Sequence, residues 1–88
     1  MQIKEITYSP HFQRVFKKLA PEWKETINQR VGIFKKDCFD TRLKTHKLKG
    51  ELKNHWSFSI TDSHRVLFCF EGNGRVGFVD VGDHSIYQ

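Results

Sequence analysis

The chain has 88 residues, so we expect one domain over residues 1–88 with a small hydrophobic core. Its formal net charge of +5 favours a polyanionic partner, such as nucleic acid or an acidic protein. No apolar run has the length of a membrane span, and Cys38 and Cys69 lack the spacing of a zinc site. We therefore expect a cytoplasmic protein with reduced thiols, no cofactor and no membrane partner.

The first part of the chain is predicted to form a strand and two helices. Residues 3–8 alternate between apolar and polar side chains, which is typical of a short strand. Ser9 and Pro10 are typical of the N-cap and first turn of a helix, and apolar residues follow at helical spacing. The Ala-Pro step at 20–21 ends this helix, and a second apolar series predicts another helix ending near Asp37.

The second part of the chain is predicted to form strands. Residues 38–50 have no clean period and indicate a basic loop, whereas residues 52–60 alternate as a strand. Residues 65–70 predict the next strand, with Arg65, Leu67 and Cys69 on the face opposite its core residues. Residues 71–74 indicate a hairpin turn, and the strand at 76–81 is apolar on both faces and therefore central.

These elements predict an α+β fold. The order is a strand, a two-helix hairpin, and then strands that complete a three- to four-stranded, mainly antiparallel sheet. The helices are expected to pack on one sheet face and to leave the other face partly polar and open. Trp56 and Phe58 share a face with Leu52 and Ile60, so we expect them in the core.

Positive charge is concentrated in one part of the sequence. Between Lys35 and Lys53 seven basic residues stand against three acidic ones, so this segment carries +4 of the total +5. Such a concentration favours a binding surface over charge that serves only solubility.

Several short motifs resemble the RelE/ParE superfamily of bacterial toxins. They are Leu48-x-Gly50, Trp56-Ser57, the run Ser63-His64-Arg65-Val66-Leu67, and Gly82-Asp83-His84. The likeness covers essentially the whole chain and is nearest to the branch that contains the YoeB and YafQ mRNA interferases. It implies a RelE-like fold and a cognate antitoxin as partner. Many members cut mRNA on the ribosome, whereas the ParE branch acts on DNA gyrase.

Metal-free RNA cleavage by attack of the 2′-hydroxyl needs a base, a cation beside the phosphate, and an acid for the leaving oxygen. The resemblance places the phosphate-contacting arginine at Arg65, a catalytic histidine at His84 with Tyr87 as the aromatic residue beyond it, and a base at His46. In this chain His84 and Tyr87 are separated, unlike the adjacent pair of YoeB. Contacts with the RNA backbone are expected from four lysines: Lys44, Lys47, Lys49 and Lys53.

Each assignment has a purely structural alternative. Arg65 could be a surface arginine paired with Asp62 or Asp80, and His84 and His46 could be a packed tail residue and a solvated loop residue. His55 and His64 could join the site or lie at strand ends, and His11 falls on the first helix with no evident partner. At the level of function, a gyrase-inhibiting toxin and a catalytically weak module that mainly binds its antitoxin remain alternatives to the mRNA endonuclease.

Overall fold

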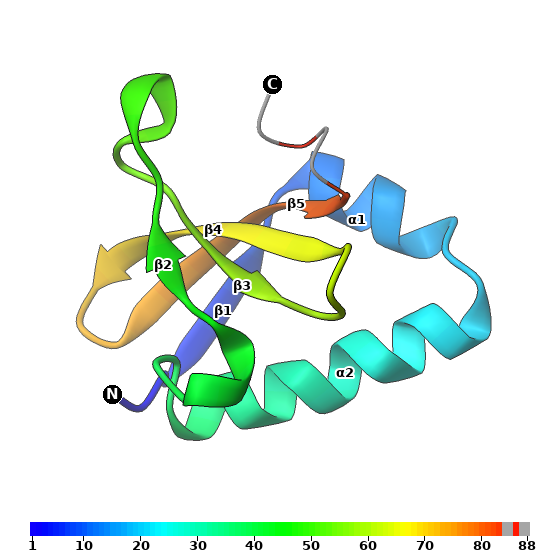
Figure 1. Ribbon diagram of the computed structural model, residues 1–88, viewed down its shortest axis with the longest axis horizontal. Coiled ribbons are helices and arrows are strands. Elements are labelled where there is room, and N and C mark those ends of the chain that lie inside the picture. The colour runs from blue at the N-terminus through cyan, green and yellow to red at the C-terminus, as the bar shows by residue number, and fades with distance from the viewer. Residues whose placement is uncertain (84–85, 87–88) are drawn as a thin grey trace.

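The computed structural model describes residues 1–83 and residue 86 (Figure 1). Two α-helices and two short 3₁₀ segments accompany five strands among the described residues. In chain order they are β1 Glu5–Tyr8, α1 Pro10–Lys17, α2 Pro21–Lys36, η1 Thr41–Leu43, β2 His46–Lys47, η2 Gly50–Leu52, β3 Trp56–Ser59, β4 Arg65–Gly72 and β5 Arg75–Gly82.

The strands form one mixed sheet in the order β1-β5-β4-β3-β2. The β1–β5 pair is parallel, and the other three pairs are antiparallel. The sheet is therefore mainly antiparallel with β5 in an interior position, which confirms the predicted α+β fold. The strand count is higher than predicted because a two-residue strand, β2, forms within the segment interpreted as a loop.

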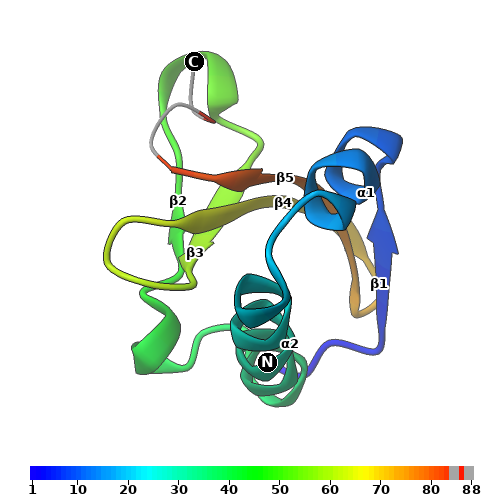
Figure 2. The ribbon, with the colours of Figure 1, turned by 90° about the vertical axis from the view of Figure 1, so that its right-hand side faces the viewer.

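The hydrophobic core lies between the helices and one face of the sheet. Phe34 of α2 is fully buried, and its ring centroid lies 4.6, 5.0 and 5.6 Å from those of Phe58, Phe68 and Phe78 on three neighbouring strands. Figure 2 shows α2 on this side of the sheet and the segment with η2 rising on the other. We call the face turned away from α2 the open face, but the expectation that it is open is wrong at its centre, where Ser57, Ser59 and Leu67 are buried.

Local signals in the sequence explain where α1 begins. The Ser9 hydroxyl accepts a hydrogen bond from the Phe12 backbone N–H at 2.9 Å, and Pro10 occupies the first turn. The same hydroxyl donates to the carbonyl of Val79 at 2.8 Å. Ser9 therefore caps α1 and also fixes the start of that helix against β5.

The strand predicted over residues 52–60 is shorter in the structure. Residues 50–52 form η2, and only Trp56–Ser59 forms β3. Gly50 has a φ of 70°, a left-handed conformation that turns the chain away from the direction of β3. The strand therefore begins only at Trp56. As a result, η2 stands beside the open face.

Candidate functional site

Strand register brings four residues from four neighbouring strands into one row. Asp80 of β5 lies opposite Leu67 of β4, Leu67 lies opposite Ser57 of β3, and Ser57 lies opposite His46 of β2. Directly opposed residues point to the same face, and Leu67 alternates with core residues on either side. These four residues, which we call the open-face row, therefore point away from α2.

Arg65 begins β4 one row further along the open face, opposite Ser59. Its Nη1 donates to the Ser59 hydroxyl at 2.5 Å and to the Thr61 carbonyl at 3.3 Å. The ion pairs among the described residues do not include Arg65, so neither Asp62 nor Asp80 pairs with it. The hydrogen bonds fix the side chain, and among the described residues it forms no direct ion pair with a carboxylate.

His46 lies exposed at the β2 end of the open-face row, and its tautomer follows from its partner. Nδ1 lies 2.9 Å from the Lys44 carbonyl oxygen, which can only accept a hydrogen bond. Nδ1 therefore carries the hydrogen, and Nε2 carries the lone pair of the neutral ring. An imidazole held in this way can act as a proton acceptor.

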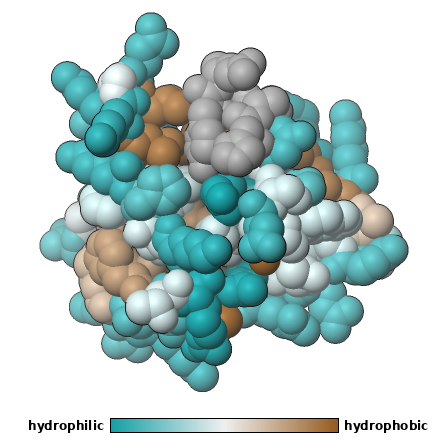
Figure 3. Space-filling view, viewed as in Figure 1, coloured by the Kyte–Doolittle hydropathy of each residue, from teal (hydrophilic) through white to brown (hydrophobic). Residues whose placement is uncertain are grey.

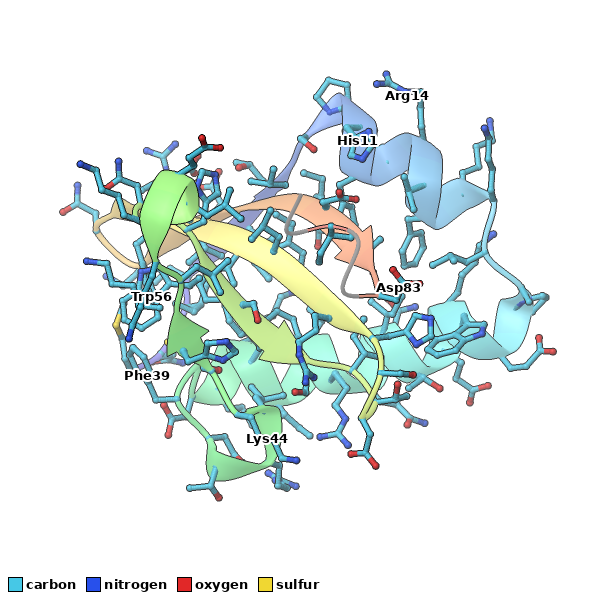
Figure 4. All side chains as sticks on the ribbon, turned by 45° about the horizontal axis from the view of Figure 1, so that its top comes forward. His11, Arg14, Phe39, Lys44, Trp56 and Asp83 are labelled. Atoms are coloured by element: carbon cyan, nitrogen blue, oxygen red, sulfur yellow. The ribbon has the colours of Figure 1, made fainter. Side chains whose placement is uncertain are left out.

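His11 has a partner that the sequence did not reveal. Its Nε2 lies 3.0 Å from Oδ1 of Asp80, although the two residues belong to α1 and to the last strand. In Figure 4 His11 lies at the start of α1, far from the labelled Phe39 and Trp56 at the β2 side of the sheet. The interpretation of His11 as unpartnered is therefore wrong. The sequence could not indicate this contact, because it forms only when α1 docks beside β5.

The four proposed RNA-binding lysines are all exposed, but they do not form one cluster. Lys49 and Lys53 flank η2 beside the open face. Lys47 lies opposite Trp56 and therefore points to the other face, and Lys44 follows η1, whose Leu43 belongs to the core. Two of the four lysines, Lys49 and Lys53, thus lie beside the sheet face that carries Arg65.

The charge concentrated in the sequence is partly neutralised in space. Arg42 makes a two-pronged contact with Asp40 through Nε at 3.0 Å and Nη2 at 2.9 Å. The hydrogen bond from Arg42 lowers the pKa of Asp40 to about 2. Arg42 is therefore committed to a structural pair, and Figure 3 shows hydrophilic residues over much of the visible surface.

Other candidates from the sequence have structural roles. The ring of His64 packs at a tilt of 45° against that of Trp23, with centroids 4.2 Å apart, and its Nδ1 lies 2.9 Å from the Ser63 hydroxyl. Phe58 is fully buried as predicted, whereas Trp56 is half-buried and packs at the edge of the core. His64 is thus held away from the open face.

His55 and Cys69 are also placed by alternation on the open face. The Nδ1 atom of His55 is buried without a hydrogen-bond partner in the described structure. Burial raises the pKa of the Cys69 thiol, and the nearby Glu71 carboxylate raises it further, so Cys69 is protonated at neutral pH. It is therefore unsuited to act as a thiolate nucleophile.

Two predicted site residues, His84 and Tyr87, lie outside the described residues. Their nearest described neighbours lie close to Arg65, because Gly82 is opposite Arg65 and a Cβ at Gly82 would approach Ile86 to 2.9 Å. Gly82 therefore provides the space in which Ile86 packs. No cluster of three His, Cys, Asp or Glu side chains within the described part of the chain is arranged to hold a metal ion.

No protein-family model and no curated protein matches the sequence, but solved structures match the fold. A YoeB/ParE toxin from Agrobacterium tumefaciens is 22% identical, with a TM-score of 0.78 over 92% of this chain and 99% of that one. The YoeB dimer from Staphylococcus aureus is 19% identical, with a TM-score of 0.75 over 96% and 99%. The E. coli DinJ-YafQ toxin-antitoxin complex matches at 16% identity, with a TM-score of 0.72 over 98% and 97%.

The chain thus has the RelE-like α+β fold of bacterial toxins. Within that class its fold is like those of the YoeB and YafQ toxins, as expected from the sequence motifs. Among the described residues, no helix combines the length and apolar character needed to span a bilayer.

Proposed function

We propose that the chain is the toxin of a toxin-antitoxin pair and that it cuts mRNA at the open face of its sheet. The observation that carries this proposal is Arg65, a fixed arginine with no described carboxylate partner on a polar sheet face. A planar guanidinium suits a phosphodiester, because it keeps its charge and offers several donors to phosphate oxygens. The fold of the YoeB and YafQ toxins supports the same assignment.

His46 is the proposed base. From ordinary strand spacing, its Cα and that of Arg65 are about 12 Å apart, across two strands and two residues. Both side chains can therefore reach one nucleotide from opposite sides. His46 Nε2 would take the proton of the 2′-hydroxyl, while Arg65 would stabilise the charge that develops on the phosphate oxygens.

The remaining roles are proposed from the sequence. His84 is assigned a catalytic role beside the phosphate and Tyr87 contact with the substrate, and Lys44, Lys47, Lys49 and Lys53 are assigned to the RNA backbone. Backbone contacts by lysines make binding weaken as salt rises, since each contact releases counterions. The proposed protein partner is a cognate antitoxin with an acidic surface; the matched solved structures include complexes named YoeB-YefM and DinJ-YafQ.

The test is induction of the gene in bacteria, followed by mapping of mRNA 5′ ends in a translating extract. We expect the wild-type chain to cut mRNA and Arg65→Gln to lose a factor on the order of 10²–10³ in rate. Arg75→Gln is the matched control. Arg75 is exposed at the end of β5 that lies away from Arg65, and its Nε lies 3.8 Å from Oε2 of Glu5. Cutting by Arg65→Gln at the wild-type rate would contradict the proposal.

The same extract separates the alternatives. A chain that leaves mRNA intact and blocks supercoiling by gyrase would be a ParE-like inhibitor. A chain that does neither and still binds its antitoxin would be a module without catalysis.

A further inference from the structure

We propose that His11 and Asp80 form the acid pair of this site, in which His11 donates a proton to the leaving 5′-oxygen and Asp80 positions the ring. The inference rests on the proposed RNA cleavage and names a residue of α1 that the sequence motifs do not mark. It starts from the contact of His11 Nε2 with Asp80 Oδ1 at 3.0 Å.

Asp80 is a fixed partner. Its Oδ1 also accepts the backbone N–H of Val81 at 2.8 Å, and its side chain is only 20% exposed. The His11 side chain is 55% exposed, so one part of the ring is held by the carboxylate while another part is open to solvent. This combination of an anchored carboxylate and an accessible imidazole can orient a proton donor.

The position of the pair relative to Arg65 fits the proposed reaction. Asp80 belongs to the open-face row, and it is the diagonal neighbour of Arg65 across β5 and β4, at a usual Cα separation of about 7–8 Å. His46 lies on the other side of Arg65, at the β2 end of the same row. A phosphate bound by Arg65 would thus have one oriented imidazole on each side.

Exposure distinguishes these two rings from the other described histidines. His11 and His46 are exposed, whereas His55 and His64 are half-buried and His64 is packed against Trp23. Of the two exposed rings, His11 is hydrogen-bonded to an anchored carboxylate and His46 to a backbone carbonyl. The contact of His11 Nε2 with Asp80 leaves Nδ1 of His11 for the leaving oxygen, which fits a proton donor.

The step balances as an acid–base transfer without a cofactor. His46 Nε2 takes the 2′-hydroxyl proton, the 2′-oxygen bonds to phosphorus, and the bond from phosphorus to the 5′-oxygen breaks. His11 Nδ1 gives its proton to that 5′-oxygen while Nε2–H stays on Asp80. The products are a 2′,3′-cyclic phosphate and a 5′-hydroxyl end, and exchange with water restores both rings.

A surface ion pair that only docks α1 is the competing explanation, and such exposed pairs add little to stability. The test uses ribosomes programmed with mRNA whose mapped cleavage site has a normal 5′-oxygen or a 5′-bridging sulfur. A thiolate leaves without protonation, so loss of the general acid is compensated by the sulfur substrate. A docking role would slow both substrates equally.

We expect His11→Asn to slow cleavage of the oxygen substrate by a factor on the order of 10²–10⁴ and to cut the sulfur substrate at nearly the wild-type rate. Asp80→Asn should show a smaller loss with the same rescue, and His46→Gln should be slow on both substrates. His64→Asn is the matched histidine control and should leave both rates unchanged.

Three results would overturn the inference. Unchanged cleavage of the oxygen substrate by His11→Asn would remove His11 from the reaction, and equal slowing of both substrates would assign it a structural role. Rescue of His84→Asn instead of His11→Asn would make His84 the acid. Absence of cutting by the wild-type chain would overturn the proposed function itself, and the acid pair with it.

Discussion

Ser59 and Arg65 face each other across β3 and β4, and their hydrogen bond fixes the residue that carries the functional proposal. Ser59 is nearly fully buried, so its hydroxyl satisfies Arg65 in a place that water does not reach freely. Only the Thr61 carbonyl would remain as a described partner if this hydroxyl were removed. The serine is therefore a positioning residue for the guanidinium.

We expect Ser59→Ala to lower the free energy of unfolding by about 1.5–3 kcal/mol, the range for hydrogen bonds to charged groups. Urea unfolding of the purified variant measures it. Ser63→Ala is the control, because the exposed Ser63 hydroxyl bonds only to side chains of its own turn and to no permanently charged group, and it should cost no more than about 1 kcal/mol. Equal effects of the two substitutions would show that the Ser59 contact contributes nothing specific.

Asp40 gives a pH-dependent contribution at the same scale. The Arg42 hydrogen bond holds the pKa of Asp40 at about 2 in the folded chain, below its usual value of 3.8. A depressed pKa stabilises the folded state above pH 3.8, and this stabilisation is lost as the pH falls toward 2. We expect the stability difference between the wild type and Asp40→Asn to shrink over that interval in denaturant titrations; parallel pH curves would contradict this.

At the scale of elements, the two helices begin differently. Ser9 caps α1 with its hydroxyl, whereas α2 follows Ala20, which makes no side-chain capping bond. Both helices start with proline. The start of α1 is therefore fixed by capping, and the start of α2 by its proline and packing.

We expect Ser9→Ala to lower the free energy of unfolding by about 0.5–2 kcal/mol, because it leaves the Phe12 N–H without its cap. The reciprocal change, Ala20→Ser, should raise it by about 0.5–1 kcal/mol by adding a cap to α2. Thermal and urea unfolding of both variants provide the measurement. A neutral Ser9→Ala would mean that neither the cap nor the hydrogen bond from the Ser9 hydroxyl to Val79 of β5 contributes to holding α1.

Elements with strong local signals could be predicted from the sequence. The Ser9-Pro10 start of α1 and the turn at Asn73, whose φ is 55°, depend on neighbouring residues and were predicted correctly. Strand β2 has only two residues, which is too short to show the alternation of apolar and polar side chains that predicts a strand. Its existence depends on pairing with β3, which only the folded chain supplies.

The same distinction applies to the site. The face on which Arg65 lies could be predicted because alternation along β4 fixes it, whereas the role of Arg65 in a reaction stays a prediction. The His11–Asp80 contact joins residues from the first helix and the last strand, and no local pattern indicates it. The run of basic residues predicted one concentrated binding surface. In the structure Arg42 is paired with Asp40 and the lysines are divided between two faces.

At the scale of the whole molecule, stability depends on the aromatic core beneath the open face. Phe34 joins α2 to three central strands through Phe58, Phe68 and Phe78. A core on one side allows the opposite face to carry polar and charged groups such as Ser59, Arg65 and Asp80. On this face Ser57, Ser59 and Leu67 are buried, so the accessible groups are those at its margins, such as His46 and Arg65.

We expect Phe34→Ala to cost about 3–5 kcal/mol, a large share of the 5–15 kcal/mol typical of a small domain. Phe39→Ala is the matched control: Phe39 lies five residues on, is 43% exposed and should lose far less. Calorimetry measures both. Similar losses for the two phenylalanines would contradict the assignment of the core to one face.

The most direct test of the central claim, that RNA binds across the open face at Arg65, is an NMR titration. Labelled protein is titrated with a short RNA whose 2′-hydroxyl at the cleavage site is replaced by hydrogen. We expect amide shifts to concentrate at residues 46, 57–59, 65–67 and 80–82 and to weaken with Arg65→Gln but not with Arg75→Gln. Shifts that concentrate on α2, or that persist unchanged in Arg65→Gln, would contradict it.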